Sequence, residues 1–185
     1  MSNQETTAPP KVCEVRIISG VTPADVETLL ELAGSSGLFS ADALLSTEDM
    51  AWDSAYGDGN EAHVFLLARA NVDTDDRIVG FLCFGPIPHW PDNYELYGIA
   101  VDPEYRRLGI GSGLVSEMCR RVAEIMGKRI FLETGAREAF EAARSFYEAS
   151  GFECEHRFHK QFIPIEGDTV YRLDVMPDES DQHYQ

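Results

Sequence analysis

Apolar and polar residues alternate along several short stretches of the chain, which is typical of strands with one buried face. The first of these stretches is rich in β-branched side chains. The second and third are separated by a short polar segment, and this spacing is typical of a hairpin. The pattern predicts seven strands, over residues 12–19, 63–70, 78–85, 94–101, 129–134, 152–163 and 169–176.

Four further stretches carry apolar residues at helical spacing. Thr22 and Pro23 are typical of a helix start, because threonine caps and proline suits the first helical position. Ser40 is a second candidate cap. The first predicted helix ends at Gly34, the second ends before Gly57, the third covers about 109–127, and the fourth, around Ala139–Tyr147, ends at Gly151.

The predicted elements follow the order strand, two helices, three strands, helix, strand, helix, two strands. Short turns join the early strands and helices separate the later ones, which favours a mixed α/β fold with helices on both faces of the sheet. A length of 185 residues suits one domain. We expect that domain at residues 12–176, with a flexible segment at 1–11 and a polar tail at 177–185.

The chain is strongly acidic, with 15 lysines and arginines against 32 aspartates and glutamates and a net charge of −17. Nucleic acids and anionic membranes require a basic surface, so neither is an expected partner. Residues 101–130 are the exception, because they carry more basic than acidic side chains. An anionic ligand is therefore expected there. The basic residues are Arg106, Arg107, Arg120, Arg121, Lys128 and Arg129.

The chain shows no signal peptide, and its apolar runs are too short for a membrane span. The four cysteines are widely spaced, so we expect reduced thiols and a cytoplasmic protein. Cys154, His156 and His159 resemble a zinc motif. On a strand His159 would point away from the other two, so no metal site is expected.

A glycine-rich segment joins the strand at 94–101 to the following helix. Gly109, Gly111 and Gly113 allow a ligand to approach the backbone closely, and the first turn of the helix offers free N–H groups to an anion. Arg106 and Arg107 add positive charge. The segment lacks the lysine of a Walker loop and the third glycine of a dinucleotide fingerprint, but it suits a pyrophosphate.

The pattern Arg106-x-x-Gly109-x-Gly111, preceded by Ile99–Pro103, resembles the acyl-CoA-binding motif of the GNAT superfamily of N-acetyltransferases. A second block, Ala143–Phe152, is similar to the A-x-x-F-Y-x-x-x-G-F segment on the last helix of that family. The resemblance covers residues 12–176. One departure is Phe140, which stands where the family often has an asparagine that binds the pantetheine arm.

The resemblance implies a GNAT-like, mostly antiparallel sheet of about seven strands with about four helices, and acetyl-CoA as cosubstrate without a metal. It implies that strand 94–101 splays from its neighbour, expected to be 152–163, and exposes backbone groups to pantetheine. The implied cofactor-binding residues are Ile99, Ala100, Val101, Arg106, Arg107, Leu108, Gly109, Ile110, Gly111, Ser112, Gly113 and Phe146.

The resemblance also implies catalytic roles. Tyr147 matches the family tyrosine that protonates the leaving thiolate. Glu95 stands where many members place the carboxylate that accepts the amine proton, and Glu133 on the next strand is the alternative base. Alternation would place Glu95 on one face with Tyr97, Ile99 and Val101 unless a bulge intervenes, and Tyr97 could shape the acceptor pocket.

The leading hypothesis is an acetyl-CoA-dependent N-acetyltransferase that acts on a small amine or a peptide amine by direct attack in a ternary complex. The first 60 residues would form much of the acceptor wall. The alternative is a non-catalytic acyl-CoA-binding or regulatory module on the same fold, and a third option is transfer of a larger acyl group. The resemblance also allows a homodimer.

Overall fold

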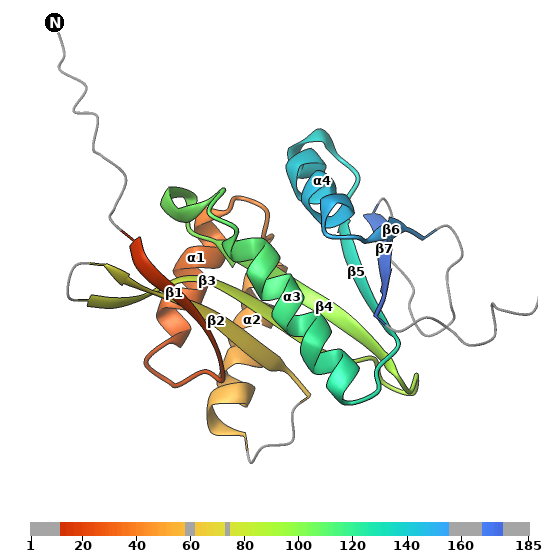
Figure 1. The fold of residues 1–185 in the computed structure, drawn as a ribbon, viewed down its shortest axis with the longest axis horizontal. Coiled ribbons are helices and arrows are strands. Elements are labelled where there is room, and N and C mark those ends of the chain that lie inside the picture. Colours follow the sequence, from red (N-terminus) through yellow and green to blue (C-terminus); the bar gives the residue numbers. More distant parts are fainter. Residues whose placement is uncertain (1–11, 58–61, 73–74, 156–167, 176–185) are drawn as a thin grey trace, which may run out of the picture.

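The computed structural model describes residues 12–57, 62–72, 75–155 and 168–175. The seven strands within these ranges form one sheet. Neighbouring strands pair antiparallel except for one parallel pair, so the expected mixed, mostly antiparallel sheet is confirmed (Figure 1). The strands are β1 Val12–Ser19, β2 Val64–Val72, β3 Asp75–Pro86, β4 Asn93–Val101, β5 Arg129–Gly135, β6 Glu153–Cys154 and β7 Asp168–Asp174. Their spatial order is β1-β2-β3-β4-β5-β7-β6.

Four α-helices cover the sheet: α1 Val26–Ser35, α2 Ala41–Tyr56, α3 Ile110–Glu124 and α4 Glu141–Ala149. Short 3-10 helices, Pro103–Tyr105 and Glu138–Phe140, precede α3 and α4. In Figure 1, α3 crosses in front of the sheet while α1 and α2 lie behind it. Side chains of α4 pack with the α3 side of the sheet.

Two apolar cores lie on opposite faces of the sheet because successive strand residues point to alternate sides. On β2, Phe65 and Leu67 pack towards α1 and α2, whereas Leu66 and Ala68 pack towards α3. The α1/α2-side core also contains Leu29, Ala51, Phe81 and Ala100. The α3-side core also contains Leu82, Leu96, Leu114, Met118, Val122, Ile130 and Leu132.

The first helix begins later than the sequence predicts. The helix starts at Val26 after Asp25, whose carboxylate accepts hydrogen bonds from the Thr22 backbone N–H at 2.9 Å and hydroxyl at 2.7 Å. Arg69 also donates to Asp25 at 2.6 Å. Asp25 is thus the N-cap residue in place of Thr22, and its carboxylate binds Thr22 and Arg69 rather than a backbone N–H of α1. The predicted cap of α2 is confirmed, since Ser40 accepts from Ala43 N at 3.1 Å.

The third helix ends earlier than predicted. It stops at Glu124, and Met126 adopts a left-handed backbone conformation with φ of 61°. Ile125 and Met126 are therefore 59% and 65% exposed and do not extend the apolar stripe into the core. Gly127 is required at this turn, because a Cβ there would lie 2.6 Å from the Tyr94 ring.

Several predictions fall on parts of the chain outside the described residues. They are the terminal segments 1–11 and 177–185, most of the predicted strand 152–163, and the histidines His156 and His159. Among the helices that the structure describes, none is long and apolar enough to span a membrane.

Candidate active site

The central feature of the candidate site is a gap between β4 and β5. The two strands pair in parallel only at Asn93–Glu95 with Arg129–Phe131. From Leu96 to Val101, β4 has no strand partner on this side in the described part of the chain, so backbone groups of Ile99, Ala100 and Val101 border the gap. The strands diverge in Figure 1.

The predicted neighbour of this splayed strand is wrong. β4 borders β5, and the described part of 152–163, β6, pairs instead with β7 at the far edge of the sheet. The crossover through α3 returns the chain beside β4, and β7 then adds antiparallel to β5. Long-range pairing of this kind is not visible in local hydrophobic patterns.

A β-bulge at Tyr97 decides which side chains share a face. Leu96 pairs with Phe84 and Gly98 pairs with Cys83, so Tyr97 is an extra residue on β4. The bulge reverses the alternation that follows it. Glu95 shares a face with Tyr97 on the α1/α2 side. The bulge is the exception under which Glu95 would not share a face with Ile99 and Val101, and these two do pack on the α3 side.

Two carboxylates lie beside the gap on the α1/α2 face of the sheet. Glu95 is on β4, and Glu133 is on β5 on the same face as Phe131, with which Glu95 is in register. Burial raises the pKa of Glu95 to about 7, and the charge of Glu133 adds to this effect. Glu95 is thus partly ionised near neutral pH, as a general base should be.

Tyr97 lies near Glu95 on the same face, and His63 packs on Tyr97. Burial, together with the charges of Glu95 and Cys83, raises the pKa of Tyr97 to about 12. His63 contacts the Tyr97 ring edge-on, with centroids 5.5 Å apart. Gly85, the partner of Glu95 on β3, makes room for this packing. A Cβ at Gly85 would lie 2.0 Å from the Ala62 carbonyl oxygen.

The sequence predicts Phe39 only as part of an acceptor wall formed by the first 60 residues, and it does not predict His63 as a site residue. Phe39 lies between α1 and α2, and its ring packs on Gly98 of the bulge, where a Cβ would lie 3.1 Å from it. No motif spacing connects either residue to Glu95. Their proximity arises only from the packing of the helical layer on the sheet.

The predicted phosphate loop has the backbone geometry that its glycines suggest. Gly109 caps α3 in a left-handed conformation with φ of 79°, and Arg107 adopts a φ of 62°. The first turn of α3 therefore presents its N–H groups beside the gap. A Cβ at Gly111 would lie 3.2 Å from the Phe146 ring, so the two sequence motifs touch each other.

Most basic side chains within residues 101–130 form ion pairs, so the unpaired positive charge is confined to fewer residues than the sequence suggests. Arg120 and Arg121 both pair with Glu117, at 2.7 and 2.8 Å. Lys128 pairs with Asp92 and Arg129 pairs with Asp174. Arg106 instead donates to the Val101 carbonyl at 3.3 Å. Among the residues that the structure describes, Arg106 and Arg107 form no ion pair, and both flank the glycine loop.

Tyr147 lies on α4, on the face of the sheet opposite Glu95. Its ring packs against Phe146, Phe152 and Tyr171, with centroid separations of 5.5, 5.9 and 6.4 Å. Burial raises the pKa of Tyr147 to about 12, so the phenol stays protonated at neutral pH. No hydrogen bond to the Tyr147 hydroxyl is formed within the described ranges.

Phe140 does not offer the polar contact that asparagine makes in many relatives. Its ring packs on Gly135 at the end of β5, where a Cβ would lie 2.6 Å away. Arg144 fixes the same connection by donating to the carbonyl oxygens of Gly135 at 2.6 Å and Arg137 at 3.0 Å. The side chain of Phe140 therefore supports the end of β5.

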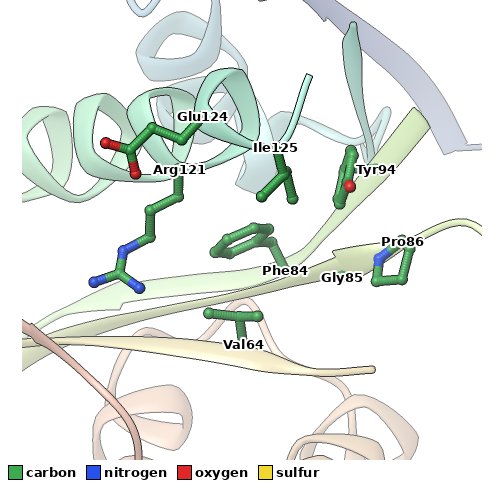
Figure 2. A pocket seen from close by; sticks show the side chains of 8 residues that line it. All are labelled: Val64, Phe84, Gly85, Pro86, Tyr94, Arg121, Glu124 and Ile125. Atoms are coloured by element: carbon green, nitrogen blue, oxygen red, sulfur yellow. The ribbon is translucent and has the colours of Figure 1, made fainter. Parts of the chain in front are cut away.

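A separate hollow of about 330 Å³ lies at the other end of α3 (Figure 2). Apolar side chains of β2, β3 and β4 line it together with Arg121, Glu124 and Ile125. None of the predicted site residues lines this hollow. It is distinct from the gap between β4 and β5.

Comparison with known proteins identifies the family. The family model of the acetyltransferase (GNAT) family matches residues 28–152. The chain belongs to the GNAT family. A GNAT-family structure from Desulfovibrio desulfuricans is 28% identical, with a TM-score of 0.76 over 88% of this chain and 100% of that chain.

More distant GNAT structures share the fold. The PaiA N-acetyltransferase from Thermoplasma acidophilum, solved with coenzyme A, is 21% identical, with a TM-score of 0.66 over 87% of this chain and 99% of that one. An uncharacterized protein of Mycobacterium leprae is 31% identical over 162 residues, 85% of this chain. The GNAT chain spans only 40% of the length of that curated relative.

The matching family model describes acetyltransferases, whose cosubstrate is acetyl-CoA. The site suits such a cosubstrate. The loop offers N–H groups and two arginines to phosphates, the missing Cβ of Gly111 keeps α3 and α4 close, and the free edge of β4 suits an amide-containing arm. Among the described residues, no cluster of three or more histidine, cysteine or acidic side chains could hold a metal.

Proposed function

We propose that this GNAT protein is an N-acetyltransferase that transfers the acetyl group of acetyl-CoA to a primary amine by direct attack in a ternary complex. The observation that carries the proposal is the placement of Glu95 and Tyr147 on opposite faces of the sheet, beside the strands that border the gap. An amine on the acceptor side and a thioester in the gap would then meet between a base and a hydrogen-bond donor.

Glu95 is the proposed general base. Its carboxylate takes a proton from the acceptor ammonium, and the neutral amine attacks the thioester carbonyl carbon. A pKa of about 7 makes this carboxylate basic enough for the task while leaving it partly ionised at neutral pH. Glu133 raises this pKa, so we propose that it tunes Glu95 rather than acting as the base itself.

Tyr147 is the proposed hydrogen-bond donor to the leaving sulfur. As the C–S bond breaks, its hydroxyl stabilises the negative charge that develops on that atom. Complete proton transfer would be uphill, because the pKa of Tyr147 is about 12 and that of a thiol is about 8.5. We therefore expect the sulfur to leave as a thiolate. The nitrogen loses two protons, one before and one after it attacks the carbonyl carbon, and Glu95 passes each of them to water.

Initial-rate kinetics test this proposal. The rate is measured against acetyl-CoA at several fixed concentrations of an amine drawn from a panel of small amines and peptides. Intersecting reciprocal plots support a ternary complex, and parallel plots would contradict it. Acetyl-CoA binding without turnover on any amine would favour the non-catalytic module, and competition between acyl-CoAs would reveal a preference for longer chains.

A further inference from the structure

The outer face of α2 carries an exposed apolar stripe. Leu45, Trp52 and Tyr56 are 60%, 37% and 74% exposed, and the rings of Trp52 and Tyr56 stack with centroids 5.7 Å apart and an interplanar angle of 14°. Their spacing of seven and four residues places them on one side of the helix. The inner side of α2 packs into the α1/α2-side core through Ala51. A stacked aromatic pair on an otherwise polar helix face is typical of an interaction surface.

The charged residues of α2 are all acidic. Asp49 and Asp53 are exposed on the same face of α2, and no ion pair among the described residues involves either of them. Between Arg16 and Arg69 the sequence holds nine acidic residues and neither lysine nor arginine. The outer face of α2 therefore offers aromatic rings together with two carboxylates that no described lysine or arginine pairs with.

This surface is close in sequence to the candidate site. His63, which contacts Tyr97 beside Glu95, follows Tyr56 by only seven residues. An extended chain of that length spans at most about 25 Å. A peptide of about twelve residues whose terminal amine lies at Glu95 is thus long enough to reach α2.

We propose that Leu45, Asp49, Trp52, Asp53 and Tyr56, the α2 surface, bind an arginine- or lysine-rich polypeptide segment that carries the acceptor amine. This inference rests on the proposed N-acetyltransferase function. Guanidinium groups stack on tryptophan and tyrosine and pair with carboxylates, so a basic segment suits both parts of the surface. A second copy of this chain would place aspartates against aspartates, and an anionic membrane would be repelled.

Fluorescence of Trp52 tests the binding step without requiring turnover. Trp52 and Trp90 are the two tryptophans of the chain, so Trp90→Phe leaves Trp52 as the reporter. Two twelve-residue peptides are titrated: one has arginine at its last six positions, and the other has glutamine there. Neither contains lysine, so each has only the terminal amine. We expect the arginine peptide to bind at least tenfold more tightly and to lose this advantage at high salt.

Two matched double variants test whether the preference for the arginine peptide depends on the α2 surface. Asp49→Asn with Asp53→Asn should abolish the preference for arginine, whereas Glu27→Gln with Glu31→Gln, which changes the net charge equally on exposed positions of α1, should leave it intact. Equal binding of both peptides, or equal effects of the two double variants, would overturn the proposal. So would concentration-dependent self-association that depends on Trp52 and Tyr56.

Acetylation assays distinguish a failure of the docking proposal from a failure of the proposed N-acetyltransferase function. With acetyl-CoA, the arginine peptide should show a KM at least tenfold lower than the glutamine peptide, at similar kcat. Turnover of small amines together with no preference between the peptides would refute the docking role and leave the proposed function standing. Absence of turnover on every amine, with binding at Trp52 intact, would refute the proposed function and with it the acceptor role of the peptide.

Discussion

Replacing Glu95 with glutamine should remove activity and stabilise the fold at alkaline pH. The pKa of Glu95 is raised from its ordinary value of 4.5 to about 7 because the carboxylate is buried near Glu133. A carboxyl whose pKa is higher in the folded protein binds its proton more tightly there. Folding therefore becomes less favourable as pH rises from 4.5 to about 7, and the loss is constant above that range.

The size of this effect follows from the pKa difference. A difference of about 2.5 pH units at about 1.4 kcal/mol each gives an upper limit near 3 kcal/mol. Partial solvent contact reduces it, so we expect Glu95→Gln to gain about 1–3 kcal/mol in free energy of unfolding at pH 8. For a chain of this size each kcal/mol raises Tm by about 2–4 °C.

Thermal unfolding at pH 4.5 and pH 8, with activity measured on the same samples, tests both the gain in stability and the loss of activity. We expect the Tm of Glu95→Gln to exceed that of the wild type at pH 8, the difference to shrink towards pH 4.5, and acetyl transfer to fall by about 100-fold or more. The control is Glu133→Gln, which should keep most of the activity. A gain in Tm that is independent of pH, or retained activity in Glu95→Gln, would refute this account of the carboxylate.

Three other substitutions probe the site and the fold. Tyr147→Phe should lower kcat by about 10²-fold, because the leaving sulfur loses its hydrogen-bond donor. The Kd for acetyl-CoA, measured by calorimetry, should not change. A change in Kd without a change in kcat would contradict that role. Gly111→Val should push the Phe146 ring away and weaken acetyl-CoA binding severalfold or more, whereas Gly34→Ala, where a Cβ meets nothing within 4 Å, should not. Burial acts to raise the pKa of Asp25, but the hydrogen bonds from Thr22 and the charge of Arg69 lower it overall. Asp25→Asn should therefore cost about 2 kcal/mol at pH 7 and progressively less as pH falls below about 4, as urea unfolding at both pH values would show.

The local parts of the site were predictable because local chemistry determines them. Gly109 adopts the left-handed conformation that favours glycine, Ser40 caps α2 through its own side chain, and the glycine loop begins a helix as expected. Each of these features depends on residues within a few positions of one another. The order and type of most elements follow from the same short-range patterns.

The geometry around Glu95 was not predictable because it depends on distant residues. The bulge at Tyr97 exists only in the pairing of β4 with β3, and it separates the face of Glu95 from that of Ile99. His63 contacts Tyr97 only because the chain at Ala62 and His63 packs over Gly85. The neighbour of β4 was misassigned for the same reason, since strand order is set by long-range packing.

We propose that acetyl-CoA lies in the gap between β4 and β5, between Glu95 and Tyr147. A crystal structure of the protein with coenzyme A tests this claim. We predict the pyrophosphate at the backbone N–H groups of residues 107–112, the pantetheine along the free edge of β4, and the sulfur within hydrogen-bonding distance of the Tyr147 hydroxyl. Coenzyme A bound with its sulfur away from both Tyr147 and the Glu95 side of the gap would contradict the claim.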